Sequence, residues 1–138
     1  SANRRLFQKL GINTVLLETQ LNDKGQGVAP ATYKANMQDA INNIKDYAPA
    51  AEFIGVLMPS LNFGDLSAYH TALTEITSAQ IDLRDFPENS TNVGADGTHL
   101  TDVGNEAMAA YLREWLAPAS PAPEPDPNTY HWTGAAWL

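Results

Sequence analysis

The sequence predicts an α/β domain built on a parallel β-sheet with helices on both faces. Short apolar runs rich in β-branched residues alternate along the chain with longer segments in which apolar residues recur at helical spacing. The resulting order is helix, strand, helix, strand, helix, strand, helix. Such alternation favours parallel strands joined by helical crossovers. In folds of this kind, functional residues gather at the carboxyl ends of the strands.

The first thirty residues contain a predicted helix, a strand and a loop. Residues 1–10 carry Leu6, Phe7 and Leu10 at helical spacing, and a glycine follows in the stop position. Residues 12–18 are aliphatic and β-branched, which indicates a buried strand. Residues 19–30 are polar and contain two glycines, so their composition predicts a loop.

The remaining predicted elements follow in regular alternation. Apolar residues at helical spacing predict a helix over residues 32–48, which Pro49 ends. The run at residues 53–58 predicts a second strand, residues 66–76 a helix, and residues 79–86 a third strand. A final helix extends to residue 116 and begins after Thr101, which we expect to cap it.

The carboxyl-terminal residues differ in composition from the predicted domain at residues 1–116. Residues 117–127 contain five prolines, so we expect residues 117–128 to form an extended, semi-rigid linker. Residues 129–138 contain one tyrosine and two tryptophans. So apolar a tail is expected to dock on its own domain or on a neighbouring subunit, the alternative being a frayed end.

Composition excludes several classes of partner and site. The formal net charge is −8 and the eight lysines and arginines are scattered apart from one adjacent pair, so neither nucleic acid nor an anionic membrane is an expected partner. No apolar run approaches the ~20 residues of a membrane span, and the amino terminus lacks a signal-peptide pattern. There is no cysteine, and His70, His99 and His131 have no metal-ligand spacing. We therefore expect no metal and no cofactor.

The chemistry is predicted to centre on Asp96 and His99, three residues apart in the loop before the last helix. A neutral histidine can take a proton from a hydroxyl nucleophile, while a carboxylate fixes its tautomer and stabilises the imidazolium that forms. The alternative is a surface loop with an incidental histidine. Parallel strands bring the loops after the first and third strands to one edge, so Asn22 is expected near His99, where its amide would suit an oxyanion hole.

These residues resemble the SGNH (GDSL-type) hydrolase family. The block Asp96-Gly97-Thr98-His99-Leu100, followed by a helix, is similar to the family's fifth block. The block Gln20-Leu21-Asn22-Asp23 is similar to its third, which usually reads Gly-x-Asn-Asp. The resemblance covers residues 1 to about 116. It implies a three-layer α/β/α, flavodoxin-like fold that lacks its first strands here, with His99 as general base, Asp96 as its orienting partner and Asn22 as an oxyanion donor.

The sequence departs from the family pattern in two respects. Gln20 stands where the family usually has glycine. The family's first block, with the nucleophilic serine, and its second block are absent, so the nucleophile is not in this chain and is expected on a segment preceding Ser1. Ser67 mimics a Gly-Asp-Ser motif but follows the wrong strand, and Asp65 or Ser67 is better explained as a helix cap. Ser60 lies just past a strand end, where serines usually satisfy turns.

The missing first strand would sit beside the strand at residues 12–18, in the sheet order that the resemblance implies. Without it that apolar strand becomes an exposed edge, which is a misfolding hazard. We therefore expect the chain to be the carboxyl-terminal portion of an SGNH domain whose amino-terminal piece remains bound as its partner.

The aromatic tail carries a second resemblance. Residues 130–137 resemble the Tyr-x-Trp-x-Gly-x-x-Trp endings of bacteriophage tail-fibre and tailspike proteins. This resemblance implies a virion tail component with an extracellular site of action, often a homotrimer, whose SGNH domain removes O-acetyl groups from a bacterial surface polysaccharide. The expected function is thus a carbohydrate O-acetylesterase. The alternative is a non-catalytic glycan-binding or tail-assembly domain that kept the fold.

Overall fold

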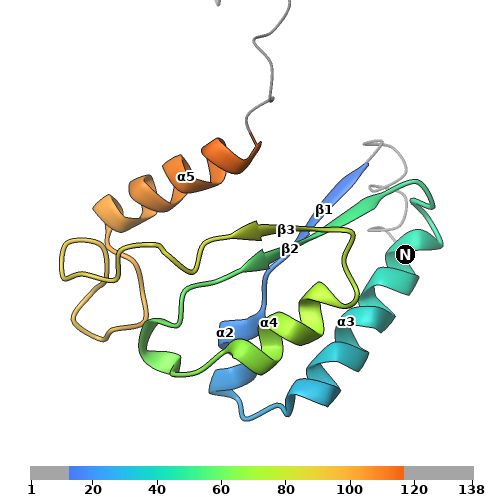
Figure 1. Ribbon diagram of the computed structural model, residues 1–138, viewed down its shortest axis with the longest axis horizontal. Helices are drawn as coiled ribbons and strands as arrows, with labels where there is room; N and C mark the ends of the chain where they lie inside the picture. Colours follow the sequence, from blue (N-terminus) through green and yellow to red (C-terminus); the bar gives the residue numbers. More distant parts are fainter. Residues whose placement is uncertain (1–12, 117–138) are drawn as a thin grey trace, which may run out of the picture.

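The computed structural model describes residues 13–116 (Figure 1). The expected α/β class is confirmed by a three-stranded parallel sheet in the order β1-β2-β3. The elements in chain order are β1 (Thr14–Leu17), α2 (Gln20–Gly25), α3 (Pro30–Lys45), β2 (Glu52–Leu57), the 3-10 turn η1 (Leu61–Phe63), α4 (Ser67–Thr74), β3 (Ala79–Asp82) and α5 (Asp102–Leu116). The predicted helix at residues 1–10, the linker at 117–128 and the tail at 129–138 lie outside the described residues.

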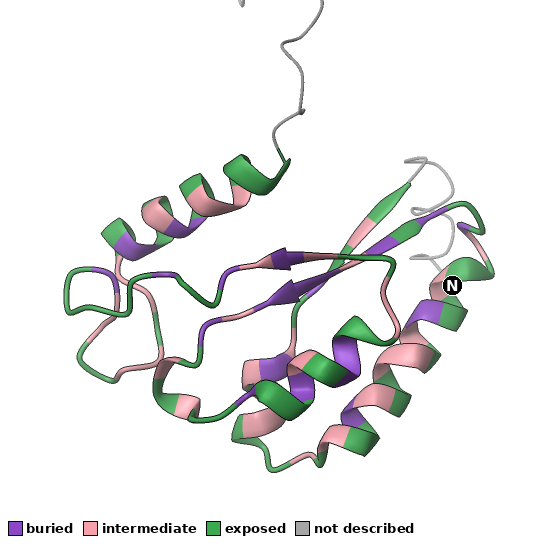
Figure 2. Ribbon diagram, viewed as in Figure 1, coloured by how far each residue is buried: buried purple, intermediate pink, exposed green. Residues whose placement is uncertain are grey.

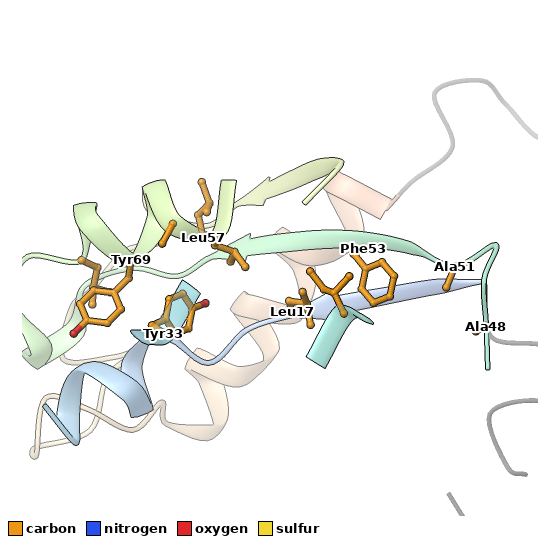
Figure 3. Close-up of a cluster of buried hydrophobic side chains, with 11 residues drawn as sticks. Leu17, Tyr33, Ala48, Ala51, Phe53, Leu57 and Tyr69 are labelled. Carbon is orange, nitrogen blue, oxygen red and sulfur yellow. The ribbon is translucent and has the colours of Figure 1, made fainter. Parts of the chain in front are cut away.

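Helices lie on both faces of the sheet because β2, its central strand, alternates between two cores. Phe53 and Leu57 of β2 point to the core beneath α3 and α4, which also holds Leu17 and Tyr69 (Figure 3). Val56 points to the opposite face, where the second core lies against α5. Figure 2 shows the buried residues concentrated on the sheet and on the helix surfaces that face it.

The residues of the second core come from β2, β3, the chain after β3 and α5. This core contains Val56, Ile81, Leu83, Phe86 and Met108. The Phe86 ring meets Tyr111 of α5 edge-on, with ring centroids 5.5 Å apart. This core fixes α5, and with it the loop that precedes α5, against the carboxyl half of the sheet.

Helix α3 begins earlier than the helical spacing indicated. Pro30 occupies its first turn, where the missing N–H costs nothing. Tyr33 and Ile41 are fully buried on its inner face, a contribution of about 1.5–3 kcal/mol each. The Tyr33 ring packs edge-on against Tyr69 of α4, with centroids 5.5 Å apart. The helix ends at Lys45, four residues before Pro49.

Two predicted segments are wrong in detail. Residues 20–25, expected in a loop, form the short helix α2, in which the Asp23 N–H donates to the Thr19 carbonyl at 3.1 Å. A helix of six residues is too short to show a helical periodicity in the sequence. The third strand ends at Asp82 rather than residue 86, because the chain turns there to place Phe86 under α5.

The strand β1 lies at the edge of the sheet. Within residues 13–116 it pairs only with β2, through the register Thr14 to Glu52 and Leu17 to Gly55. Leu16 points away from the α3 and α4 face and is 42% exposed. No helix in the described part of the chain is long and apolar enough to cross a membrane.

Candidate functional site

The loop that carries Asp96 and His99 is closed by its own backbone. Val93 and Leu100 form an isolated antiparallel bridge, and the Gly94 N–H donates to the His99 carbonyl at 2.8 Å. Gly97 turns the chain between them with a φ of 70°, which an L side chain rarely adopts. The loop is therefore a defined turn that holds both side chains in one place.

Asp96 contacts His99 through the side chain and the backbone. Its Oδ2 lies 2.6 Å from His99 Nδ1, and its Oδ1 accepts from the backbone N–H groups of Thr98 at 2.9 Å and His99 at 3.0 Å. These hydrogen bonds, first that of the His99 ring, hold the pKa of Asp96 far below its usual value. The carboxylate stays ionised across the physiological pH range.

The Asp96 carboxylate also selects the tautomer of His99. A carboxylate only accepts hydrogen bonds, so in the neutral imidazole Nδ1 carries the proton and Nε2 keeps its lone pair. Within residues 13–116 no side chain hydrogen-bonds Nε2, and the His99 side chain is 83% exposed. The imidazole is thus oriented as a base toward open space.

Helix α5 is attached directly to this loop. The Thr101 hydroxyl accepts from the Gly104 N–H at 3.0 Å, so the predicted cap is confirmed. The Thr101 N–H donates to the Asn92 carbonyl at 3.0 Å. A Cβ on Gly104 would lie 1.9 Å from that carbonyl oxygen, so only glycine allows this approach. The closeness of helix and loop fixes where the Asp96–His99 pair sits.

Asn22 lies on α2, just beyond the carboxyl end of β1. Its side chain is exposed and makes no hydrogen bond within residues 13–116, so its amide is available to a ligand. Helix α2 contacts η1, where Phe63 meets Gly25, and Asn62 of η1 lies against Gly97. Helix α2, which carries Asn22, and the turn that carries His99 therefore both contact η1, and no hydrogen bond joins Asn22 to His99 in the described chain.

The burial and hydrogen bonds of Gln20 explain why this block begins with glutamine and not with glycine. It is fully buried, its Nε2 donates to the Val56 carbonyl at 2.8 Å, and its Oε1 accepts from the Met58 N–H at 3.4 Å. The amide joins the end of β1 to the end of β2. Its role is to hold α2 in place.

The two serines considered as nucleophiles are not in contact with His99. Asp65 Oδ1 accepts from the Ser67 N–H at 2.8 Å just before α4, but the N-cap position is Leu66 and has no side-chain cap, so the expected cap at Asp65 or Ser67 is wrong. The Ser60 hydroxyl lies 3.4 Å from a Glu88 carboxylate oxygen. In the described chain no hydroxyl group is placed against His99 Nε2.

A concavity that the sequence did not predict opens beside β3. It has a volume of about 920 Å³ and is bordered by α4, the ends of β2 and β3, and the last turn of α5. We call it the β3 groove; its lining includes Ser60, His70, Asp82, Arg84, Glu88 and Trp115. The signal for this groove in the sequence was a pair of polar residues at the end of a strand, since Asp82 ends β3 and Arg84 follows it.

Three charged or titratable groups in the β3 groove, Arg84, Asp82 and His70, are held by hydrogen bonds. Arg84 binds Asp82 in a bidentate pair, with Nε to Oδ1 at 2.8 Å and Nη2 to Oδ2 at 2.5 Å, which lowers the pKa of Asp82. His70 Nε2 lies 3.1 Å from the Met58 carbonyl, and burial lowers the pKa of His70. His70 is therefore neutral at pH 7, with Nε2 as donor and Nδ1 as acceptor.

Within residues 13–116 no cluster of three histidine, aspartate or glutamate side chains is arranged to hold a metal ion. Comparison with known proteins finds no matching family model, no similar curated protein and no similar solved structure. The functional assignment of the Asp96–His99 pair therefore depends on its geometry and on the resemblance of the motifs around it.

Proposed function

We propose that this chain is the carboxyl-terminal portion of an SGNH-type serine esterase domain that removes O-acetyl groups from a bacterial surface polysaccharide. The observation that carries the proposal is the 2.6 Å contact between Asp96 Oδ2 and His99 Nδ1, in a turn fixed to the start of α5. This contact leaves Nε2 as a base, which is the state that activation of a serine hydroxyl requires.

The reaction follows from these roles. His99 Nε2 takes the proton of the serine hydroxyl as its oxygen attacks the acetyl carbonyl carbon, and Asn22 donates to the developing oxyanion. Collapse of the tetrahedral intermediate breaks the ester bond, and His99 returns the proton to the leaving sugar oxygen. A water molecule then hydrolyses the acetyl-serine by the same steps and releases acetate. Asp96 keeps the imidazole oriented throughout and stabilises its charged form.

The nucleophile belongs, in this proposal, to a segment preceding Ser1. The resemblance places the family's first strand beside β1, and its serine would follow that strand at the same sheet edge as α2. The outer edge of β1 is unpaired within residues 13–116, so the described fold has room for it. The three-layer SGNH fold is then completed by the amino-terminal piece of the domain.

The biological setting is proposed from the tail motif. Its similarity to bacteriophage tail-fibre and tailspike endings favours a virion tail protein, assembled as a homotrimer, that acts outside the host cell on acetylated polysaccharide. The predicted negative charge of −8 disfavours nucleic acid as a partner.

The test is hydrolysis of p-nitrophenyl acetate and of an O-acetylated polysaccharide by the protein with its nucleophile-bearing segment present. His99→Ala and Asp96→Asn are each expected to lower kcat/KM by about 10²–10⁴-fold, the usual contribution of a general base, without unfolding the domain. Asp39→Asn removes an exposed carboxylate of α3 that makes no hydrogen bond in the described chain, and serves as the matched control. Full turnover by folded His99→Ala would refute the assignment.

The second candidate is a non-catalytic glycan-binding or tail-assembly domain. The observation that favours it is the 83% exposure of the His99 side chain together with the absence, in the described residues, of a hydroxyl against Nε2. A fluorophosphonate probe separates the two candidates because it labels only an activated serine. Labelling that is lost in His99→Ala supports the esterase, whereas no labelling of the intact protein supports the binding or assembly domain.

A further inference from the structure

Neither Asp96 nor His99 lines the β3 groove. Gln80 and Asp82, two residues apart on β3, point to the same side of the strand and face His70 of α4. Trp115 borders the groove from the last turn of α5 and is 51% exposed. A polar floor with one open aromatic face is thus displayed along an edge strand.

The charges around the groove disfavour an anionic ligand. Among the lining residues in the described chain, Arg84 is the one permanent cation, and Asp82 already occupies two of its donors. Carboxylates of Asp65 and Glu88 add negative charge to the lining, whereas Glu75 is paired with Lys34. A phosphate, sulfate or carboxylate ligand would therefore meet more repulsion than attraction.

The remaining polar groups that line the groove are suited to accept hydrogen bonds from hydroxyl groups of a ligand. His70 Nδ1 accepts, since Nε2 donates to the Met58 carbonyl. The Asp82 oxygens keep lone pairs beyond those that Arg84 uses, and Glu88 accepts at the rim beside Ser60. Acceptors at several positions, with an indole face beside them, match a ligand that has many O–H donors and an apolar ring face.

We propose that the β3 groove binds a neutral oligosaccharide, with Trp115 stacking on a sugar ring and His70, Asp82 and Glu88 accepting hydrogen bonds from its hydroxyl groups. The site goes beyond the proposed esterase, because no ester bond takes part and the Asp96–His99 pair is not used. Through this groove the protein would bind a sugar chain at the edge of β3, away from the site proposed for acyl transfer.

The test is titration of the protein, by calorimetry and by ¹H–¹⁵N NMR, with maltoheptaose, cellopentaose and N-acetylchitopentaose. These probes carry no O-ester, so binding is read without turnover and the result does not depend on the esterase proposal. Trp115→Ala is expected to weaken binding at least about tenfold, or about 1.4 kcal/mol, and Trp115→Phe to retain most of it. Leu116→Ala is the matched control, because Leu116 is the next residue of α5, is 53% exposed and does not line the groove.

The groove acceptors are tested by a second variant, Asp82→Asn. It removes the carboxylate that holds Arg84 and is expected to weaken oligosaccharide binding while the fold is retained, since Asp82 is partly exposed. Absence of binding to all three oligosaccharides at millimolar concentration would overturn the proposal. So would equal weakening by Trp115→Ala and Leu116→Ala, or binding of tetralysine in place of the sugars, which would make the groove a site for basic peptides.

Discussion

Replacing Gly104 by alanine tests whether the approach of α5 to the preceding loop positions the Asp96–His99 turn. Gly104 is the third residue of α5 and is buried. An added Cβ would lie 1.9 Å from the Asn92 carbonyl oxygen and 2.7 Å from its carbon. Both are backbone atoms, so no side-chain rotation relieves the overlap. The helix and the loop must separate by more than about 1 Å to restore an ordinary contact.

The expected change in stability has two opposing parts. Alanine in place of glycine within a helix stabilises by about 0.8–1.0 kcal/mol when nothing else changes. The overlap costs about 1–3 kcal/mol or more, and separation also weakens the hydrogen bond from Thr101 N–H to the Asn92 carbonyl, worth about 1 kcal/mol. The free energy of unfolding of the variant is therefore expected to be about 1–3 kcal/mol lower than that of the wild type. Helix propensity alone predicts the opposite, a more stable variant.

The assay is urea unfolding followed by far-UV circular dichroism, with hydrogen exchange at the Gly94 and Thr101 amides as a local readout. Asn105→Ala is the control, because Asn105 is the next residue of α5 and its side chain is exposed. It is expected to leave stability unchanged or raise it by a few tenths of a kcal/mol. A Gly104→Ala protein as stable as wild type, with unchanged protection at both amides, would refute the close contact and the positioning argument with it.

Two further predictions concern Gln20 and His70, polar side chains that contact the backbone at the end of β2. Gln20→Leu keeps the side-chain volume but removes the hydrogen bonds to Val56 and Met58, and urea unfolding should show a loss of about 1–3 kcal/mol; an unchanged midpoint would contradict the role given to Gln20. Because burial lowers the folded pKa of His70, the unfolded chain binds its proton more readily, and stability should be full above about pH 6.5 and fall as pH drops below it. His70→Gln should flatten this dependence between pH 7.5 and 5, and an identical pH profile in that variant would assign the loss to other groups.

The fold class could be predicted from the sequence because each core is built from long segments whose apolar residues recur with a strong periodicity. Phe53 and Val56 alternate between the two faces of the central strand, as the apolar run at residues 53–58 indicated. The contact between Asp96 and His99 was also predictable in kind, since residues three apart in a tight turn are within reach of each other. The Thr101 cap followed from the same local chemistry.

The polar residues at the end of β3 were a local signal, but the assembled β3 groove and α2 were not predictable, for physical reasons that differ. The groove needs Asp82, His70 and Trp115 from three separate elements, and their meeting depends on how α4 and α5 pack around an edge strand. Helix α2 is only six residues long, and its position depends on the hydrogen bond from the buried amide of Gln20 to β2. Neither long-range contact leaves a pattern within a local window of sequence.

Leu16 offers a test of whether a further segment covers β1 in the working protein. Val15 and Leu17 point to the core beneath α3, so Leu16 points to the opposite face, beside Ile54. It is 42% exposed in the described chain, and a lysine there can extend its ammonium into water. In the chain of 138 residues alone, Leu16→Lys is therefore expected to change the free energy of unfolding by less than about 1 kcal/mol.

The outcome differs if the proposed amino-terminal segment, with its first strand, packs beside β1. The same lysine would then be enclosed by apolar side chains, and Leu16→Lys would cost about 3 kcal/mol or more in the completed domain. Unfolding of both forms in urea compares the two costs, with the 138-residue chain as the internal control. Equal, small costs in both forms would show that β1 keeps an open face, and the serine that His99 is proposed to activate would have to reach it from another side of the molecule.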